Sequence, residues 1–398
     1  MKNEAQQTFL SEAGQAPGAG RRSPLAAFLI CLPMMILTFM MLFGRQRPVG
    51  AVQDIAFAAT FVFFNLMFFL MVYRQRTERY RAVLFIVYAV AFVISFISQI
   101  VELRGTMALT QANILRAEAP FCHIAIPMTL IPAALNKTLV FPASIAGGSH
   151  SAAAMFIIWI GASLALGRGF CGWGCFFGGL EDGFSRIFKR PLLKLTGGLW
   201  RYLPYAVLLV IVLTAATSLS PTYCMWLCPF KAVTEYVQVT SFTTLIQMII
   251  FISLFAGLVV ILPVLTKRRT QCALFCPFGA FQSFTNKVSG CGIRADKDKC
   301  VKCGLCARSC PTFSIDAESI EAGGSRLTCL KCGKCVDLCP KGALSYHVKG
   351  AAPAAKSDVQ RLLFVYPAFL FLATMGGAMV RDALFRIVKL VATGHMIG

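Results

Sequence analysis

Seven long apolar stretches constrain the fold of this chain more than any other feature of its sequence. They are 25–44, 54–73 (charge-free after Asp54), 82–101, 151–167, 203–222, 243–266 and 362–380. An α-helix needs about 20 apolar residues to cross the hydrocarbon core of a bilayer, and these stretches approach that length. The 398-residue chain is 57% hydrophobic and 14% charged, which is too apolar for one soluble core. We therefore expect an all-α polytopic membrane protein with about seven transmembrane helices.

The formal net charge of +21 is sorted by loop rather than gathered in one patch. Cations crowd the loops at 74–81 and 168–202 and residues 267–269, whereas the alternate loops carry few. Cytoplasmic loops of membrane proteins are enriched in Lys and Arg. The pattern places the N-terminus, these segments and the chain up to about 358 in the cytoplasm, with loops 101–150 and 221–242 outside. It predicts a multi-pass protein of the cytoplasmic (inner) membrane, in contact with lipid and not with nucleic acid.

The pattern C-x2-C-x2-C-x3-C-P occurs twice near the C-terminal end of the chain. Three thiolates on such a loop reach three corners of a [4Fe–4S] cluster, and the cysteine before proline binds the other cluster. Zinc sites or disulfides are the alternatives, and a reducing cytoplasm disfavours disulfides. The predicted iron ligands are Cys300, Cys303, Cys306 and Cys339 for the first cluster, and Cys329, Cys332, Cys335 and Cys310 for the second.

Three further cysteine pairs form an internal repeat with a period of about 50 residues. CGWGCFFGGLEDGF begins at Cys171, CMWLCPFKAVTEYV at Cys224 and CALFCPFGAFQSFT at Cys272, each after an apolar stretch. Because the chain would cross the bilayer twice between the first and third pairs, these two return to the same face. Cys171, Cys175, Cys272 and Cys276 are therefore predicted ligands of a third [4Fe–4S] cluster at the membrane surface. A zinc site, or cysteines serving only as small apolar residues, is the alternative.

C-x3-C-P motifs after membrane helices, ahead of a two-cluster bacterial ferredoxin pattern at about 295–347, resemble the membrane-bound polyferredoxin group. That group includes the quinol-oxidising subunit of periplasmic nitrate reductase systems and accessory proteins of nitrous oxide reductase and cytochrome oxidase assembly. The resemblance covers about 150–347 and implies membrane electron transfer with clusters on the cytoplasmic side. This chain departs from the group at Phe176, where proline is usual, in its extra motif at 224–228, and in lacking a large extracytoplasmic flavin domain.

The second pair, Cys224 and Cys228, faces outside by the same count of crossings. Cys122 and His123 belong to the predicted outer loop, in a charge-free segment interrupted by prolines at 121–136. Three interpretations stay open: an outer cluster on Cys122, Cys224 and Cys228 with His123 or an external ligand as the fourth, a disulfide between Cys224 and Cys228, or unliganded thiols. An outer cluster would complete an electron route across the bilayer.

Ionisable residues at helix ends can bind a quinone head group or pass its protons, and they also serve as ordinary helix caps. The candidates are Glu102, Arg104, His123, Lys137 and His150. Cys31 and Cys291 have no partner by spacing and are expected to be structural. No residue is predicted to be catalytic. The sequence has no C-x-x-C-H haem motif, no G-x-G-x-x-G motif placed ahead of a helix as in nucleotide-binding folds, and no P-loop.

The predicted organisation is a polar cytoplasmic tail (1–23), a membrane domain with six helices (24–276), an inserted α+β two-cluster ferredoxin domain (277–350), a seventh helix (360–380) and an interfacial or flexible tail (381–398). The favoured function is one-electron transfer between the quinone pool, or an outer partner, and a cytoplasmic redox partner. The alternative is an iron–sulfur accessory protein for metalloenzyme assembly, metal reduction or redox regulation. The direction of electron flow stays open, because cluster potentials depend on hydrogen bonding and solvent.

Overall fold

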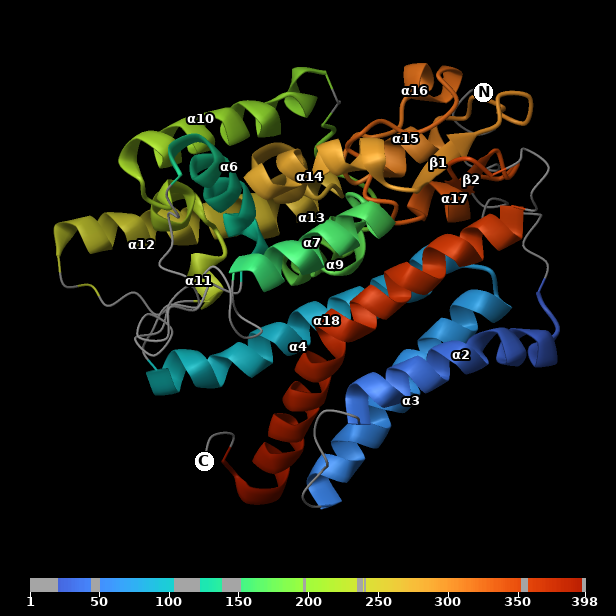
Figure 1. Ribbon diagram of the computed structural model, residues 1–398, viewed down its shortest axis with the longest axis horizontal. Coiled ribbons are helices and arrows are strands. Elements are labelled where there is room, and N and C mark those ends of the chain that lie inside the picture. Colours follow the sequence, from blue (N-terminus) through green and yellow to red (C-terminus); the bar gives the residue numbers. More distant parts are fainter. Residues whose placement is uncertain are drawn as a thin grey trace.

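The computed structural model describes residues 21–43, 51–103, 122–137, 152–195, 198–234, 239, 241–351 and 357–395. Helices dominate this part of the chain and form two groups that meet along α4 and α18, with a small two-stranded domain at one end (Figure 1). The predicted mostly helical architecture is confirmed at this level.

The first group consists of four long helices, α2 (Pro24–Phe43), α3 (Ala51–Tyr73), α4 (Thr77–Leu103) and α18 (Ser357–Thr393). Small residues let α18 approach its neighbours closely, as is usual between membrane helices. A Cβ at Gly376 would lie 3.0 Å from the Tyr88 ring of α4, and one at Gly377 would lie 2.9 Å from Leu42 of α2. The helix that follows the ferredoxin cysteines is therefore packed into the N-terminal helices.

The second group carries the three C-x3-C pairs in short turns between its helices. Its helices are α6 (Ile126–Asn136), α7 (Ala152–Leu166), α9 (Phe176–Phe184), α10 (Leu203–Ser218), α11 (Lys231–Thr234), α12 (Phe242–Leu254), α13 (Leu262–Thr266) and α14 (Pro277–Val288). The short turns are η1 (His123–Ala125), α8 (Gly169–Trp173), η2 (Leu199–Arg201), η3 (Tyr223–Leu227), η4 (Phe255–Ile261) and η5 (Gln271–Phe275).

The second cysteine of each pair breaks one helical turn and starts the next segment. Cys175, Cys228 and Cys276 all adopt an extended backbone conformation. Pro277 then occupies the first position of α14, where its missing N–H and fixed φ cost nothing. At the first pair, Phe176 takes the place of this proline as the first residue of α9. The change from proline to phenylalanine therefore leaves the turn intact.

The ferredoxin domain is built on an antiparallel pair, β1 (Cys291–Ala295) and β2 (Leu344–Val348), in which Cys291 lies opposite Val348. Three short helices complete it: α15 (Leu305–Ser309), α16 (Ala317–Glu321) and α17 (Lys334–Leu338). Helix α14 packs against α7 and α10 of the second group, and the domain boundary at 277 stays a prediction. Tyr346 of β2 stacks on Phe364 of α18, with ring centroids 4.9 Å apart, which joins the domain to the helix.

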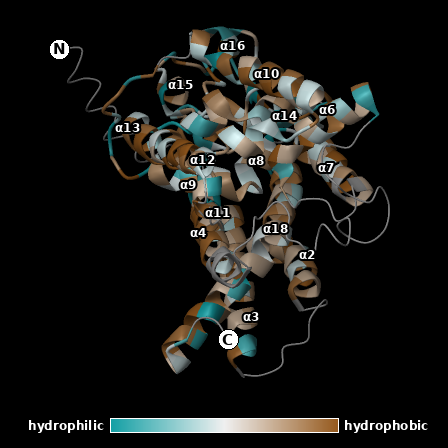
Figure 2. Cartoon of the chain, turned by 90° about the vertical axis from the view of Figure 1, so that its left-hand side faces the viewer, coloured by the Kyte–Doolittle hydropathy of each residue, from teal (hydrophilic) through white to brown (hydrophobic). Residues whose placement is uncertain are grey.

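Among the described residues, five helical segments are long and apolar enough to cross a membrane: Pro24–Leu42, Val52–Tyr73, Leu199–Ser218, Phe242–Thr266 and Ser357–Thr393. They coincide with five of the seven predicted spans, and Figure 2 shows the apolar residues that cover such helices. The predicted span at 82–101 lies within the 27-residue α4. The span at 151–167 corresponds to α7, which has 15 residues. A multi-pass membrane protein is supported, and the number seven stays a prediction.

The C-terminal tail differs from the expectation of a separate interfacial segment after 380. Helix α18 runs through 37 residues without a break to Thr393. Residues 381–393 contain neither proline nor glycine, so nothing in them ends a helix. The helix stops before Gly394, whose φ of 72° is left-handed.

Candidate iron–sulfur centres

The first set of ferredoxin cysteines lines one cavity at the surface of the small domain. Cys300 and Cys303 precede α15, Cys306 lies within it and Cys339 follows α17. All four border a cavity of about 350 Å³, and all are half-buried. Burial, and then the charges of the other three thiolates, raises the pKa of Cys306 to about 11. A positively charged group among these sulfurs would offset that repulsion.

The second set lines a separate, smaller cavity farther inside the domain. Cys329, Cys332 and Cys335 meet Cys310 of the other run there, and all four are buried. Burial, and then the charges of the other three, raises the pKa of Cys335. The structure thus brings the eight cysteines together in the crossed arrangement expected from their spacing. Their ligation of iron stays a prediction.

Both cysteine loops turn through the same backbone conformation. Lys302 and Lys331 have φ values of 52° and 51°, and Gly304 and Gly333, two residues later, have 71° and 84°. These left-handed residues curl each loop, and successive backbone N–H groups in such a turn form a concavity that suits an anion. Glycine adopts this conformation without the strain that a side chain brings.

Backbone N–H groups also donate to the sulfur of the cysteine that precedes each proline. The N–H of Ser314 donates to Cys310 Sγ, and that of Ala343 to Cys339 Sγ, both at 3.2 Å. In each run the donor follows the cysteine by four residues. Such bonds stabilise negative charge on sulfur and are one determinant of cluster potential.

The third predicted set also meets at one cavity, among the helices of the second group. Cys171 of α8, Cys175, Cys272 of η5 and Cys276 all border it and are all buried. The apolar side chains around them include Phe177 and Phe278, which come two residues after the second cysteine of their pairs. Thiolates from the first and third pairs are therefore within one site, as the count of crossings predicted.

Two buried arginines connect the two halves of this cavity, and each one reaches across to the cysteine pair of the other half. Arg168, three residues before Cys171, donates to the carbonyl of Cys272 at 2.9 Å. Arg269, three residues before Cys272, donates to the carbonyl of Cys171 at 3.0 Å and to the sulfur of Cys272 at 3.4 Å. Each pair of cysteines is thus held by the arginine of the other pair.

Glu181 of α9 fixes the start of the η5 turn that carries Cys272. Its carboxylate accepts the backbone N–H of Gln271 at 2.6 Å and that of Cys272 at 3.1 Å. Burial raises its pKa to about 7, although Arg269 and these two N–H groups act in the opposite direction. The first motif therefore orients the third motif through a side chain as well as through backbone contacts.

His123 lies at the third cavity and not at an outer cluster. Its Nε2 is 3.1 Å from Cys175 Sγ, and its ring packs against Phe278 with centroids 4.9 Å apart. Burial lowers its pKa to about 3, so the imidazole is neutral. The side chain reaches this position because η1 and α6 pack against α14.

The second C-x3-C pair lies beside the third cavity, which corrects the expectation that a full bilayer separates them. Tyr223, next to Cys224, accepts a hydrogen bond from Gln271 at 2.8 Å. Phe230, two residues after Cys228, borders the third cavity and stacks on Phe177 at 3.8 Å between centroids. The chain turns back after α10 through Leu219, whose φ is 47°, so the pair returns to the interior.

Cys122 remains a neighbour of this pair. Burial, and then the charge of Cys122, raises the pKa of Cys228. A fourth centre on Cys122, Cys224 and Cys228 therefore stays a prediction, now as a neighbour of the third centre. The expected electron route from one face of the bilayer to the other loses its outer terminus.

Direct contacts join the second and third cavities. The backbone N–H of Arg269 donates to the carbonyl of Pro311, next to Cys310, at 3.1 Å. Trp173, between Cys171 and Cys175, donates its indole N–H to the carbonyl of Lys331 at 3.2 Å. Two hydrogen bonds therefore connect the segments that carry the second and third cysteine sets.

A buried charge network holds α4, α9 and the ferredoxin domain together. Asp182 of α9 pairs with Arg81 of α4 at 3.2 Å and with Arg186 at 3.0 Å. Arg186 also pairs with Glu78, whose backbone N–H donates to Asp337 of α17 at 2.8 Å. Arg81 further donates to the carbonyl of Gly172, beside Cys171, at 2.7 Å. The network fixes the first motif against the small domain.

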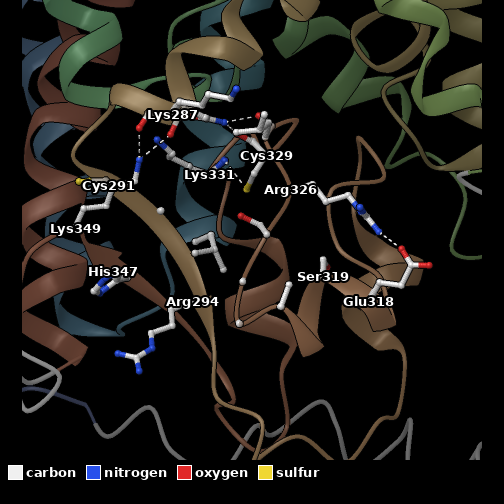
Figure 3. A pocket seen from close by; sticks show the side chains of 18 residues that line it. Lys287, Cys291, Arg294, Glu318, Ser319, Arg326, Cys329, Lys331, His347 and Lys349 are labelled. Atoms are coloured by element: carbon white, nitrogen blue, oxygen red, sulfur yellow. Dashed lines mark hydrogen bonds and ion pairs between the residues drawn. The ribbon is translucent and has the colours of Figure 1, made fainter.

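A larger pocket of about 670 Å³ lies beside the second cavity, and its charged lining residues are five cations and Glu318. Figure 3 shows Cys329 and Lys331 on one side of it and Arg326, paired with Glu318, on another. Lys331 donates to the carbonyl of Leu166 at 2.8 Å, and burial lowers its pKa to about 8. Cys291 of β1 also lines this pocket, whereas Cys31 is buried in α2.

The residues predicted for a quinone site are not gathered in the described part of the chain. Arg104, His150 and the side chain of Glu102 lie outside the described residues. Lys137 is exposed after α6, and His123 is half-buried at the third cavity. Sequence reasoning also missed the pattern R-x2-C-x3-C-x-F-G, which begins at Arg168 and Arg269 and is absent at the second pair. That pattern alone would have matched the first pair with the third.

Comparison with protein-family models agrees with the cysteine spacing. Residues 292–340 match a 4Fe-4S dicluster domain. The model of a 4Fe-4S binding domain matches three times, at 149–194, 200–246 and 248–294. The predicted threefold repeat and the predicted ferredoxin pattern are both confirmed by these matches.

Two curated sequences are similar over part of their lengths. The "Putative electron transport protein YccM" of Escherichia coli (strain K12) is 25% identical over 175 residues, which cover 41% of this chain and 47% of that protein. The "Uncharacterized protein MJ0750" of Methanocaldococcus jannaschii is 30% identical over 167 residues, or 40% of this chain and 64% of its own. The chain thus spans less than two thirds of either relative. No solved structure matches significantly.

Proposed function

We propose that this chain, a membrane-associated 4Fe-4S ferredoxin-like protein, carries single electrons between a membrane-soluble carrier and a soluble redox protein. The observation that carries the proposal is the gathering of twelve cysteines into three sets of four, each around its own cavity. Thiolates in sets of four fit [4Fe–4S] clusters, which would supply the redox chemistry when bound. The protein's own residues supply ligands, spacing and charge.

The order of the three sets supports a route from solvent to membrane. The first set is half-buried at the surface, the second is buried in the same domain, and the third is buried in the second group of helices. Crossed ligands join the first two sets, since Cys310 and Cys339 each belong to the run that serves the other set. The backbone contacts of Arg269 and Trp173 join the second set to the third.

The soluble partner is proposed to dock at the first set with an acidic surface. Lys297, Lys299, Lys302 and Lys341 line that cavity and are exposed. Complementary charge speeds the encounter of redox partners more than it strengthens their complex. The cationic pocket beside Cys329 extends this positive surface.

The membrane partner is proposed to be a quinone, and the ferredoxin domain to face the cytoplasm. Arg81 and Arg186 share Asp182 as a partner and Arg268 contacts the ferredoxin domain, which supports a common side of the membrane for these basic segments. Phe177, Phe230 and Phe278 border the third set, and this apolar lining supports a lipid-soluble carrier as the partner. Reduction of the anaerobic protein by a quinol is expected. Inertness toward quinol and quinone, together with reduction of a metal ion, would favour the accessory role instead.

Iron and sulfide content, measured together with electron paramagnetic resonance on anaerobically purified protein, tests the number of centres. About twelve irons per chain are expected, about eight would leave only the ferredoxin pair, and about sixteen would add the centre near Cys228. Cys272→Ser should remove the signal of the third centre and leave the ferredoxin signals unchanged. Iron-free protein would refute the whole proposal.

A further inference from the structure

We propose that Arg168 and Arg269 act as charge-compensating and positioning residues for the third centre and raise its reduction potential. The inference rests on the proposed function, since it takes a cluster in the cavity of Cys171 and Cys272 as given. Nothing in the proposed function itself assigns a role to either arginine.

Both guanidinium groups are buried, at 1% exposure for Arg168 and 0% for Arg269. Burying a cation is costly unless an anion compensates it. Within the described residues, neither guanidinium lies within ion-pair distance of a carboxylate, and their measured partners are two carbonyls, a hydroxyl and a thiol. The charges of Glu181 and Asp182 act on Arg269 from beyond that distance, and the thiolates and sulfides of a cluster would add an anion in direct contact.

Several N–H groups of the two arginines also lack an acceptor. Nε and Nη1 of Arg269 and Nε of Arg168 are buried and have no hydrogen-bond partner among the described residues. Buried donors are nearly always bonded in native proteins. Because both side chains border or touch the cysteine cavity, cluster sulfur is the acceptor within reach.

Space for the guanidinium groups is provided by glycine in both halves of the site. Gly178 and Gly279 each follow the second cysteine of their pair by three residues. A Cβ at Gly178 would collide with Nη2 of Arg269, and one at Gly279 would lie 3.1 Å from Nη2 of Arg168. The second pair has Pro221 in place of the arginine and Lys231 in place of the glycine. The arrangement is therefore specific to the two pairs that meet.

The effect on potential follows from charge. Reduction adds one electron, and hence one negative charge, to a cluster that four thiolates already make anionic. Two fixed positive charges in a medium of low polarity stabilise the reduced form more than the oxidised form. Removing either charge should therefore shift the midpoint potential of the third centre to a more negative value.

A redox titration of the detergent-solubilised holoprotein, followed by electron paramagnetic resonance, tests this inference. Arg269→Gln and Arg168→Gln should each shift the third signal negative, and Arg269→Lys should shift it less because it keeps the charge. Arg268→Gln, at the next position of the chain, is the matched control. Its guanidinium donates to the Cys310 carbonyl of the second set, so the third signal should stay in place.

Iron content separates the possible failures. If the native protein holds only about eight irons, the third centre itself is absent and the proposed function fails. If it holds about twelve and neither glutamine variant moves the third midpoint, or all signals move equally, the charge role is refuted. Should both glutamine variants lose the third signal, its retention in Arg269→Lys supports the role of charge, and its loss there overturns it.

Discussion

Neutralising Asp182 should lower the free energy of unfolding more than neutralising any exposed charged residue. Asp182 is 3% exposed and pairs with Arg81 at 3.2 Å and with Arg186 at 3.0 Å. Asp182→Asn keeps the shape of the side chain and removes its charge. The buried Arg81, which is 0% exposed, then lacks its nearest anion.

The size of the effect follows from the distance. At 3.2 Å and an effective dielectric constant of about 20, one such pair is worth about 5 kcal/mol before desolvation is subtracted. Loss of one partner of a buried pair typically costs about 3–5 kcal/mol, because the other charge stays buried. Burial alone would raise the pKa of Asp182, but Arg81 and Arg186 outweigh it and lower the pKa. The stabilisation is therefore present above about pH 4 and is lost as the pH falls toward the folded-state pKa.

The assay is unfolding of the holoprotein in mixed micelles of increasing sodium dodecyl sulfate, followed by the fluorescence of the four tryptophans. Glu318→Gln removes an exposed partner of Arg326 and is the control, with an expected cost below about 1 kcal/mol. Arg81→Gln combined with Asp182→Asn should cost about 1–3 kcal/mol less than the sum of the single changes. Equal midpoints for Asp182→Asn and the control, or strict additivity, would refute the ion-pair argument.

Two further predictions concern the ferredoxin domain. Gly333→Ala should destabilise the domain by about 1–3 kcal/mol more than Gly304→Ala. Both glycines have positive φ, but only at Gly333 would the new Cβ meet a side chain, the Tyr346 hydroxyl. Loss of the cluster signals at the same temperature in both variants would contradict this. Changing Lys302 and Lys341 to glutamate should slow reduction of the protein by an acidic soluble ferredoxin about tenfold at low salt, with unchanged iron content. The same change at Lys287, which lines the larger pocket, should slow it less. Stopped-flow rates that neither change affects would place the docking surface elsewhere.

The ferredoxin centres were predictable because a few residues of local sequence determine them. The spacing of Cys300, Cys303 and Cys306 confines three sulfurs to one tight loop, whatever the rest of the chain does. The positions of five membrane helices followed from apolar length alone. Both inferences depend on local chemistry and needed no knowledge of how the helices pack.

Counting membrane crossings succeeded for one pair of motifs and failed for another. It brought Cys171 and Cys272 together, but it placed Cys228 across the bilayer, where the structure has it close to the same cavity. The count assumes that every apolar stretch traverses the membrane and that the chain emerges at its end. The left-handed turn at Leu219 folds the second motif back inward, and a positive φ at leucine has no sequence signature.

Some of the site could have been found by a closer comparison of the repeats. Arg168 and Arg269 occupy the same place in the first and third motifs, and the second motif has proline there. By contrast, the contact between His123 and Cys175 joins segments 52 residues apart through the packing of α6, which no periodic pattern encodes.

The reciprocal arginines also set an order for biosynthesis. The carbonyl that Arg168 binds belongs to a residue made 104 positions later, and Arg269 reaches back 98 positions. While the ribosome is still translating α10 and α12, the earlier half of this site has neither its second pair of sulfurs nor its second cation. Assembly of this cysteine set must therefore wait until those helices have been made, whereas the ferredoxin cysteines lie close together in the sequence.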